Sequence, residues 1–189
     1  MELKTLNEIE IISAPHSKIS EVDFENLTFG NVFTDHMLVC DYVDGAWQKP
    51  VIEPYAPFMI DPSAKVFHYG QAIFEGMKAY KDEQDDVWLF RPDENYHRFN
   101  KSATRMAMPE VPEDIFLGGL HRLLEIEKEW VKKGKGNTLY IRPFMIATGH
   151  GVIAAPSQEY RFMIILSPAR AYYSGEVKVI IAEHYSRAA

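Results

Sequence analysis

A tyrosine and an arginine alternate with apolar residues in the segment Leu139-Tyr140-Ile141-Arg142. The two-residue period of a β-strand places Tyr140 and Arg142 on one face and sends Leu139 and Ile141 to the core. A guanidinium beside a core needs an anionic partner, because an unpaired buried charge is costly. That partner is either a structural Asp or Glu or the carboxylate of a ligand, which suits the planar fork of arginine. The pattern alone leaves both possibilities open.

A second arginine, Arg98, lies in a helix predicted over residues 93–107. It shares the polar side of that helix with Asn95, Ser102 and Arg105, away from the apolar stripe. From the pattern alone, Arg98 is a surface arginine.

Other kinds of chemistry find little support in the sequence. The seven histidines show no metal-ligand spacing and Cys40 is the one cysteine, so no metal site is predicted. The sequence has neither the phosphate-binding G-x-x-x-x-G-K-[ST] motif nor G-x-G-x-x-G. The Gly149-His150-Gly151 segment alone indicates only a short flexible loop.

Composition narrows the class of protein further. The 189 residues are 47% hydrophobic, enough for one domain with a sizeable core and too apolar for disorder. A net charge of −7 without a basic stripe argues against a nucleic-acid partner. The longest apolar stretch, 162–166, is too short to span a membrane. One cysteine and no secretory segment predict a cytoplasmic protein.

The predicted elements come in blocks of strands, helices and strands, which is typical of an α+β fold. Residues 1–28 are expected to form an arm with little structure of its own. The predicted strands cover 31–42 and 47–53 around a turn at 43–46, then 77–81, 87–91, 138–147, 160–167 and 177–183. Residues 67–76 are expected to run from a strand end into a helical turn, and helices are predicted over 93–107 and 113–133.

Six different short motifs follow one another along the chain after about residue 24. They are residues 29–37, 68–80, 89–92 with 97–99, 139–143, 166–168 with 172–173, and 184–188. Together they resemble the branched-chain amino acid aminotransferases, enzymes of the fold-type IV class that use pyridoxal 5′-phosphate (PLP).

The resemblance implies an architecture and a reaction. Residues 29–170 would form the small N-terminal α+β domain, an antiparallel sheet with helices. Residues 171–189 would form the interdomain linker and the first strand of a larger domain. The implied reaction moves the amino group of leucine, isoleucine or valine to 2-oxoglutarate through PLP, in a cytoplasmic homodimer.

The resemblance also implies roles for particular residues. Arg98 would hold the phosphate of PLP, and Arg142 would bind the second carboxylate of glutamate or 2-oxoglutarate. Val152 would contribute its side chain to the active site of the partner subunit. The residues implied to line the pocket for the substrate side chain are Phe29, Tyr69, Phe74, Tyr140 and Tyr172. Such a pocket needs apolar walls and one carboxylate binder, because it takes both leucine and glutamate.

One residue of the family has no counterpart in this chain. The resemblance places the lysine that forms the Schiff base with PLP beyond Ala189. The chain is therefore expected to hold no catalytic residue and to be inactive alone. Segment 177–183 is expected to be a strand with no sheet to join, which favours aggregation or pairing between chains.

Three alternatives stay open at this point. A D-amino acid aminotransferase or an aminodeoxychorismate lyase would share the fold. The motifs at 69–76 and 140–143 favour the branched-chain type. A naturally short domain that binds a partner or dimerises without catalysis is the third alternative.

Overall fold

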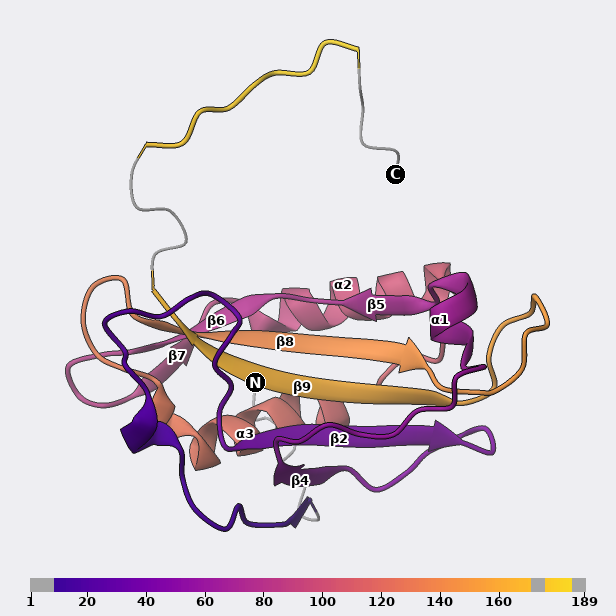
Figure 1. Cartoon of the computed structure of the whole chain (residues 1–189), viewed down its shortest axis with the longest axis horizontal. Helices are drawn as coiled ribbons and strands as arrows, with labels where there is room; N and C mark the ends of the chain where they lie inside the picture. The colour runs from indigo at the N-terminus through magenta and orange to yellow at the C-terminus, as the bar shows by residue number, and fades with distance from the viewer. Residues whose placement is uncertain (1–8, 171–175, 185–189) are drawn as a thin grey trace.

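The computed structural model describes residues 9–170 and 176–184 (Figure 1). A single sheet of nine strands runs in the order β1-β4-β2-β9-β8-β6-β7, with β3 paired to β2 and β5 paired to β8. Its neighbouring strands are antiparallel except β1 and β4. Together with the helices, this sheet confirms the predicted α+β class.

The strands are β1 (Glu10–Ile11), β2 (His36–Val43), β3 (Ala46–Trp47), β4 (Val51–Pro54), β5 (Ala72–Phe74), β6 (Met77–Lys81), β7 (Val87–Leu89), β8 (Thr138–Ala147) and β9 (Tyr160–Ala169). The α-helices are α1 (Lys65–Tyr69), α2 (Pro92–Arg105) and α3 (Gly119–Ile126). A π-helical turn covers Asp114–Gly118, and 3-10 turns cover Ile19–Glu21 and Lys128–Trp130.

The core lies between the sheet and helices α2 and α3, which lie behind it in Figure 1. Phe99 of α2, Phe116 of the π-helical turn and Phe162 of β9 are fully buried. Their ring centroids lie 5.3 to 5.5 Å apart, at distances typical of favourable aromatic pairs. At Gly119 a Cβ atom would lie 3.0 Å from Leu38, so glycine allows α3 to approach β2 closely.

The predicted turn at 43–46 is confirmed. Val43 pairs with Ala46, and both central residues have positive φ, 53° at Asp44 and 77° at Gly45. An Asp-Gly pair supplies this backbone conformation, whose twist matches that of the two strands it joins.

The predicted order of elements within 67–76 is wrong. Helix α1 comes first, ends at Gly70 with φ 61°, and is followed by β5. Glycine adopts this left-handed conformation without a Cβ penalty, and it therefore stops the helix there. Pairing of Phe74 with Phe144 of β8 then holds the next residues extended.

The single helix predicted over 113–133 is also wrong, because the segment divides into the π-helical turn, α3 and a 3-10 turn. Helix α3 ends at Glu127, whose side chain is buried. Glu127 accepts hydrogen bonds from the backbone N–H of Asp35 at 3.3 Å and from His36 Nδ1 at 2.5 Å. This contact between distant parts of the chain fixes the end of the helix.

Residues 9–28, the described part of the arm, are more ordered than predicted, since β1 pairs with β4 and joins the sheet. The arm is also tied to the buried carboxylate of Asp35. Asp35 accepts hydrogen bonds from Ser17 Oγ at 2.5 Å, the backbone N–H of Lys18 at 2.8 Å and Trp130 Nε1 at 3.1 Å. Residues 17 and 18 are therefore anchored by an acceptor on the residue that precedes β2.

This anchor should respond to acid. Burial raises the pKa of Asp35, but the hydrogen bonds from Lys18, Ser17 and Trp130 outweigh burial and leave the pKa below its usual range. A lowered pKa stabilises the fold above the unfolded value of about 3.9, and this contribution is lost as the pH falls through the lowered pKa. The protection factor of the Lys18 amide, which corrects for the pH dependence of intrinsic exchange, should therefore stay high down to about pH 4 and fall below it. In Asp35→Asn we expect fast exchange at neutral pH, and slow exchange there would contradict the anchor.

Residues 176–184 form no strand, contrary to the prediction for 177–183. They run as an extended segment away from the sheet (Figure 1), with Val177, Val179, Ile180 and Ile181 all exposed. No described strand pairs with the segment, so its strand-like composition has no ladder of hydrogen bonds to join.

Candidate functional site

Arg142 lies on the face of the sheet opposite α2 and α3. Its guanidinium carbon lies 4.2 Å from the centre of the Phe74 ring, and its Nε and Nη2 donate to Tyr140 Oη at 3.1 and 2.7 Å. Within residues 9–170 and 176–184, no Asp or Glu forms an ion pair with Arg142. The structural acid left open by the sequence is therefore not found in the part of the chain that is described.

The guanidinium keeps donors for a further partner. Of its five N–H groups, Tyr140 takes two, which leaves both on Nη1 and one on Nη2. The Tyr140 hydroxyl is also available as a donor, since no described residue accepts a hydrogen bond from it. A carboxylate placed here would meet several convergent donors.

Apolar side chains surround these donors. The ring of Phe29 packs edge-on against that of Tyr140, with centroids 5.0 Å apart. Ile165 lies opposite Arg142 on β9 and therefore shares its face of the sheet. We call Phe29, Phe74, Tyr140 and Arg142 the arginine cluster. It combines a cation with apolar walls, which suits an acid that has an apolar body.

Gly76 makes room for this arrangement. A Cβ atom at Gly76 would lie 2.5 Å from Tyr140 Oη, well inside contact distance. Gly76→Ala should therefore displace the Tyr140 ring, break its bonds to Arg142 and cost about 1–3 kcal/mol of stability. The checks are urea unfolding and the Arg142 Nε–H signal in NMR spectra. Ala72→Ser, at an exposed position of β5, is the control, and an unchanged Arg142 signal in Gly76→Ala would contradict this prediction.

Tyr69 and Val152 lie apart from the arginine cluster, at the end of β8 where α1 meets the loop after it. The Tyr69 hydroxyl donates to the carbonyl of Val152. The loop is further held by Lys65, whose buried ammonium donates to the carbonyl of Ile153 at 2.7 Å. Gly151 N–H donates to Ser63 Oγ at 3.0 Å. The side chain of Val152 is thus exposed on a loop that is firmly attached to α1.

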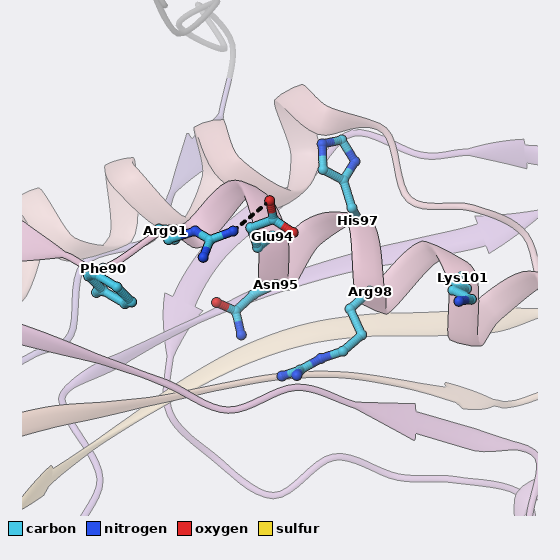
Figure 2. A pocket seen from close by; sticks show the side chains of 7 residues that line it. All are labelled: Phe90, Arg91, Glu94, Asn95, His97, Arg98 and Lys101. Atoms are coloured by element: carbon cyan, nitrogen blue, oxygen red, sulfur yellow. Dashed lines mark ion pairs between the residues drawn. The ribbon is translucent and has the colours of Figure 1, made fainter. Parts of the chain in front are cut away.

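Arg98 extends from α2 to the buried carboxylate of Glu75. Its Nε and Nη2 donate to the two carboxylate oxygens at 2.5 and 2.8 Å, and the Arg98 side chain still stays 68% exposed. It lines a hollow of about 500 Å³ on the outside of α2 (Figure 2). Basic and polar side chains share that lining: Arg91, Asn95, His97 and Lys101.

Three consecutive residues connect the two arginines. Phe74 is exposed and contacts Arg142, Glu75 is buried and binds Arg98, and Gly76 accommodates Tyr140. Strand alternation sends Phe74 and Glu75 to opposite faces. Of the remaining predicted site residues, Tyr172 lies outside the described residues.

Sequence reasoning gave no role to Glu75, Gly76 or Lys65. For Glu75 a signal was present, because alternation directs an acid next to Phe74 toward the helix that carries Arg98. For Gly76 and Lys65 the decisive contacts come from β8 and from the loop after it, and no local pattern reveals them.

Neither a membrane-spanning helix nor a cluster of metal ligands occurs among the described residues. No helix among them is long and apolar enough to cross a membrane. No group of three or more His, Cys, Asp or Glu side chains among residues 9–170 and 176–184 could hold a metal ion.

Comparison with known proteins gives several strong matches. The chain is 49% identical over 171 residues to branched-chain-amino-acid transaminase 1 of Bacillus subtilis (strain 168), a match that covers 88% of the chain and 48% of that protein. It is 43% identical over 175 residues to the branched-chain-amino-acid aminotransferase of Mycolicibacterium smegmatis, which covers 90% of the chain and 48% of that protein. The chain thus spans about half the length of these relatives. No protein-family model matches it.

Solved structures share the fold. The branched-chain aminotransferase of Thermoproteus uzoniensis, solved with norvaline, aligns with a TM-score of 0.54 at 17% identity, over 70% of this chain and 41% of that one. The enzyme of Thermobaculum terrenum (M4 mutant) aligns with a TM-score of 0.51 at 16% identity, over 71% of this chain and 39% of that one. The resemblance predicted from the six motifs is confirmed.

Proposed function

This chain is a relative of the branched-chain aminotransferases over 88% of its length, and we propose that the whole protein shares their activity. The reaction would transfer the amino group of leucine, isoleucine or valine to 2-oxoglutarate with PLP as cofactor. The observation that carries this proposal is Arg142, a guanidinium in apolar surroundings with no acid partner in the described chain.

The arginine cluster supports a pocket for two kinds of substrate. An aliphatic side chain would pack against Phe29, Phe74 and Tyr140, where burial of apolar surface favours binding. The distal carboxylate of 2-oxoglutarate would accept from Nη1 and Nη2 of Arg142 and from the Tyr140 hydroxyl. The ring of Phe74 contacts the Arg142 guanidinium through a cation–π interaction. This contact would hold the guanidinium in place both when the carboxylate is bound and when an aliphatic side chain replaces it.

The residues around Arg98 fit the phosphate of PLP. Glu75 takes two of the five N–H donors of Arg98, and three remain toward the hollow beside α2. When bound, PLP would supply an electron-withdrawing ring and the aldehyde carbon that carries the amino group between the two acids. Residues of this chain would hold its phosphate and orient the substrate side chain.

A homodimer in the cytoplasm is part of the proposal. Tyr69 and Val152 lie away from the arginine cluster but are hydrogen bonded to each other. We infer that the two are presented together to the active site of a partner subunit. The tie from Lys65 to the Ile153 carbonyl supports this role, because it fixes a loop whose apolar tip is exposed.

The test is an assay of leucine-dependent glutamate formation from 2-oxoglutarate. We propose that the product of the complete gene is active with L- but not D-amino acids, and that the 189-residue chain with added PLP is inactive. Preference for D-amino acids, or release of pyruvate from aminodeoxychorismate, would favour the two alternatives of the same fold. A complete gene that encodes only these 189 residues would favour the non-catalytic alternative.

A further inference from the structure

Glu75 is a buried acid held by two side chains of α2 and by the backbone of Gly76. Its side chain is 4% exposed. Oε1 accepts from Arg98 Nε at 2.5 Å, and Oε2 accepts from Arg98 Nη2 at 2.8 Å, Asn95 Nδ2 at 2.9 Å and the backbone N–H of Gly76 at 3.3 Å. Each oxygen is therefore bonded, and the orientation of the carboxylate is fixed.

The fixed carboxylate orients an exposed guanidinium. A long side chain that is 68% exposed normally samples many rotamers, and a surface ion pair restrains it little. Here two parallel N–H···O bonds to a rigid, buried acceptor define the plane of the Arg98 fork. In Figure 2 the side chains of Asn95 and Arg98 point the same way from α2, whereas His97 points to the other side.

The ion pair is stable at neutral pH. Burial raises the pKa of Glu75, but hydrogen bonds from Arg98 and Asn95 outweigh burial and leave the pKa lowered. The hydrogen bond to Glu75 raises the pKa of Arg98. Both groups are therefore charged, and the fork keeps its orientation over the physiological range.

The other charges of the hollow leave it favourable for an anion. Arg91 pairs with Glu94 at 2.9 Å, and both are largely exposed. Lys101 contributes a positive charge that no described acid pairs. The three remaining N–H groups of Arg98 thus belong to a hollow that is lined by more basic than acidic side chains.

We propose that Glu75 is a positioning residue that holds the Arg98 guanidinium ready to bind a phosphate monoester. Under the proposed function, on which this inference rests, that monoester is the phosphate of PLP. The carboxylate occupies the Nε–Nη2 edge of the fork and leaves Nη1 and the second Nη2 proton for phosphate oxygens. Asn95 assists by fixing Oε2.

The experiment titrates the 189-residue chain with inorganic phosphate and follows the Arg98 N–H signals by NMR. In the wild type we expect phosphate to shift these signals. Glu75→Gln keeps the shape but loses the charge and should weaken binding by about tenfold or more. Glu75→Asp, which restores a carboxylate, should recover part of that loss.

Two further variants keep the test decisive. Glu125→Gln removes a surface partner of Arg122 and is the matched control, with unchanged phosphate affinity. Should Glu75→Gln not fold, Asn95→Ala replaces it, with an expected loss of a few-fold. The inference is overturned if phosphate leaves the wild-type Arg98 signals unmoved. It is equally overturned if folded Glu75→Gln binds as tightly as the wild type or more tightly, because Glu75 would then compete with phosphate.

The result separates this inference from the proposed function. Phosphate binding that depends on Glu75, in a protein without transaminase activity, would refute only the proposed function. An active transaminase whose phosphate affinity is insensitive to Glu75 would refute only the positioning role.

Discussion

Arg142→Ala is expected to weaken the binding of 2-oxoglutarate by about 10- to 100-fold, while the binding of the leucine-derived oxo acid changes little. The variant removes the bonds that Arg142 would make to the distal carboxylate, but water and the Tyr140 hydroxyl can still solvate that carboxylate, so the net loss is about that of one charge-assisted hydrogen bond, about 1.5–3 kcal/mol. The apolar walls Phe29, Phe74 and Tyr140 stay in place, so an aliphatic side chain keeps its contacts.

The measurement is a comparison of the two proposed half-reactions in the complete protein, with KM and kcat for each acid. Arg142→Lys should restore little, because an ammonium cannot present two parallel donors. Arg161→Ala is the matched control, since Arg161 is bound by Asp41 at 2.7 and 2.9 Å. Equal losses for both oxo acids in Arg142→Ala would show that Arg142 supports the structure and not the selection of substrate.

Phe162→Ala is expected to lower the free energy of unfolding by about 3–5 kcal/mol. Phe162 is fully buried and contacts Phe99 and Phe116, each at a centroid distance of 5.5 Å. The ring joins β9 to both helical segments, and a close-packed core relaxes only partly into the cavity that alanine would leave. Such a loss is large beside a total stability of about 5–15 kcal/mol.

Urea unfolding of the 189-residue chain measures the effect. Phe67→Ala is the control, because Phe67 on α1 is 61% exposed. This variant should lower the free energy of unfolding by no more than about 0.5 kcal/mol. A change below about 1 kcal/mol in Phe162→Ala would mean that the aromatic contacts contribute little to the core.

The sequence predicts well where one periodicity dominates. The alternation in 138–147 gives β8 with its correct bounds, and it places Tyr140 and Arg142 together on the face opposite the helices. Helix α2 and the turn at 43–46 follow from a clear apolar stripe and from Asp-Gly. In each case the local preference and the tertiary contacts favour the same conformation.

Prediction fails where distant contacts decide. The end of α3 depends on the bonds between Glu127 and residues 35–36, more than 90 positions earlier in the chain. The order of α1 and β5 depends on Gly70 and on a pairing with β8. Segment 177–183 has a strand composition but no described partner, and composition alone cannot supply one.

In the candidate site, too, local periodicity predicts some features and distant contacts decide the others. That Arg142 would need an anion follows from strand alternation, whereas the lack of a described acid partner follows only from the structure. Arg98 is exposed as the helical pattern predicts, yet the acid that binds it comes from another element.

The Phe74-Glu75-Gly76 segment has a consequence for how the protein tolerates insertions and deletions. Slippage of β5 against β8 by one residue would exchange the faces of Phe74 and Glu75. A carboxylate would then lie beside Arg142 and cancel its charge, while Arg98 would lose its acceptor. A single-residue change in chain length at 70–76 thus disables both arginines at once. The exposed loop at 82–86, which joins β6 to β7, carries no such constraint and should accept added residues.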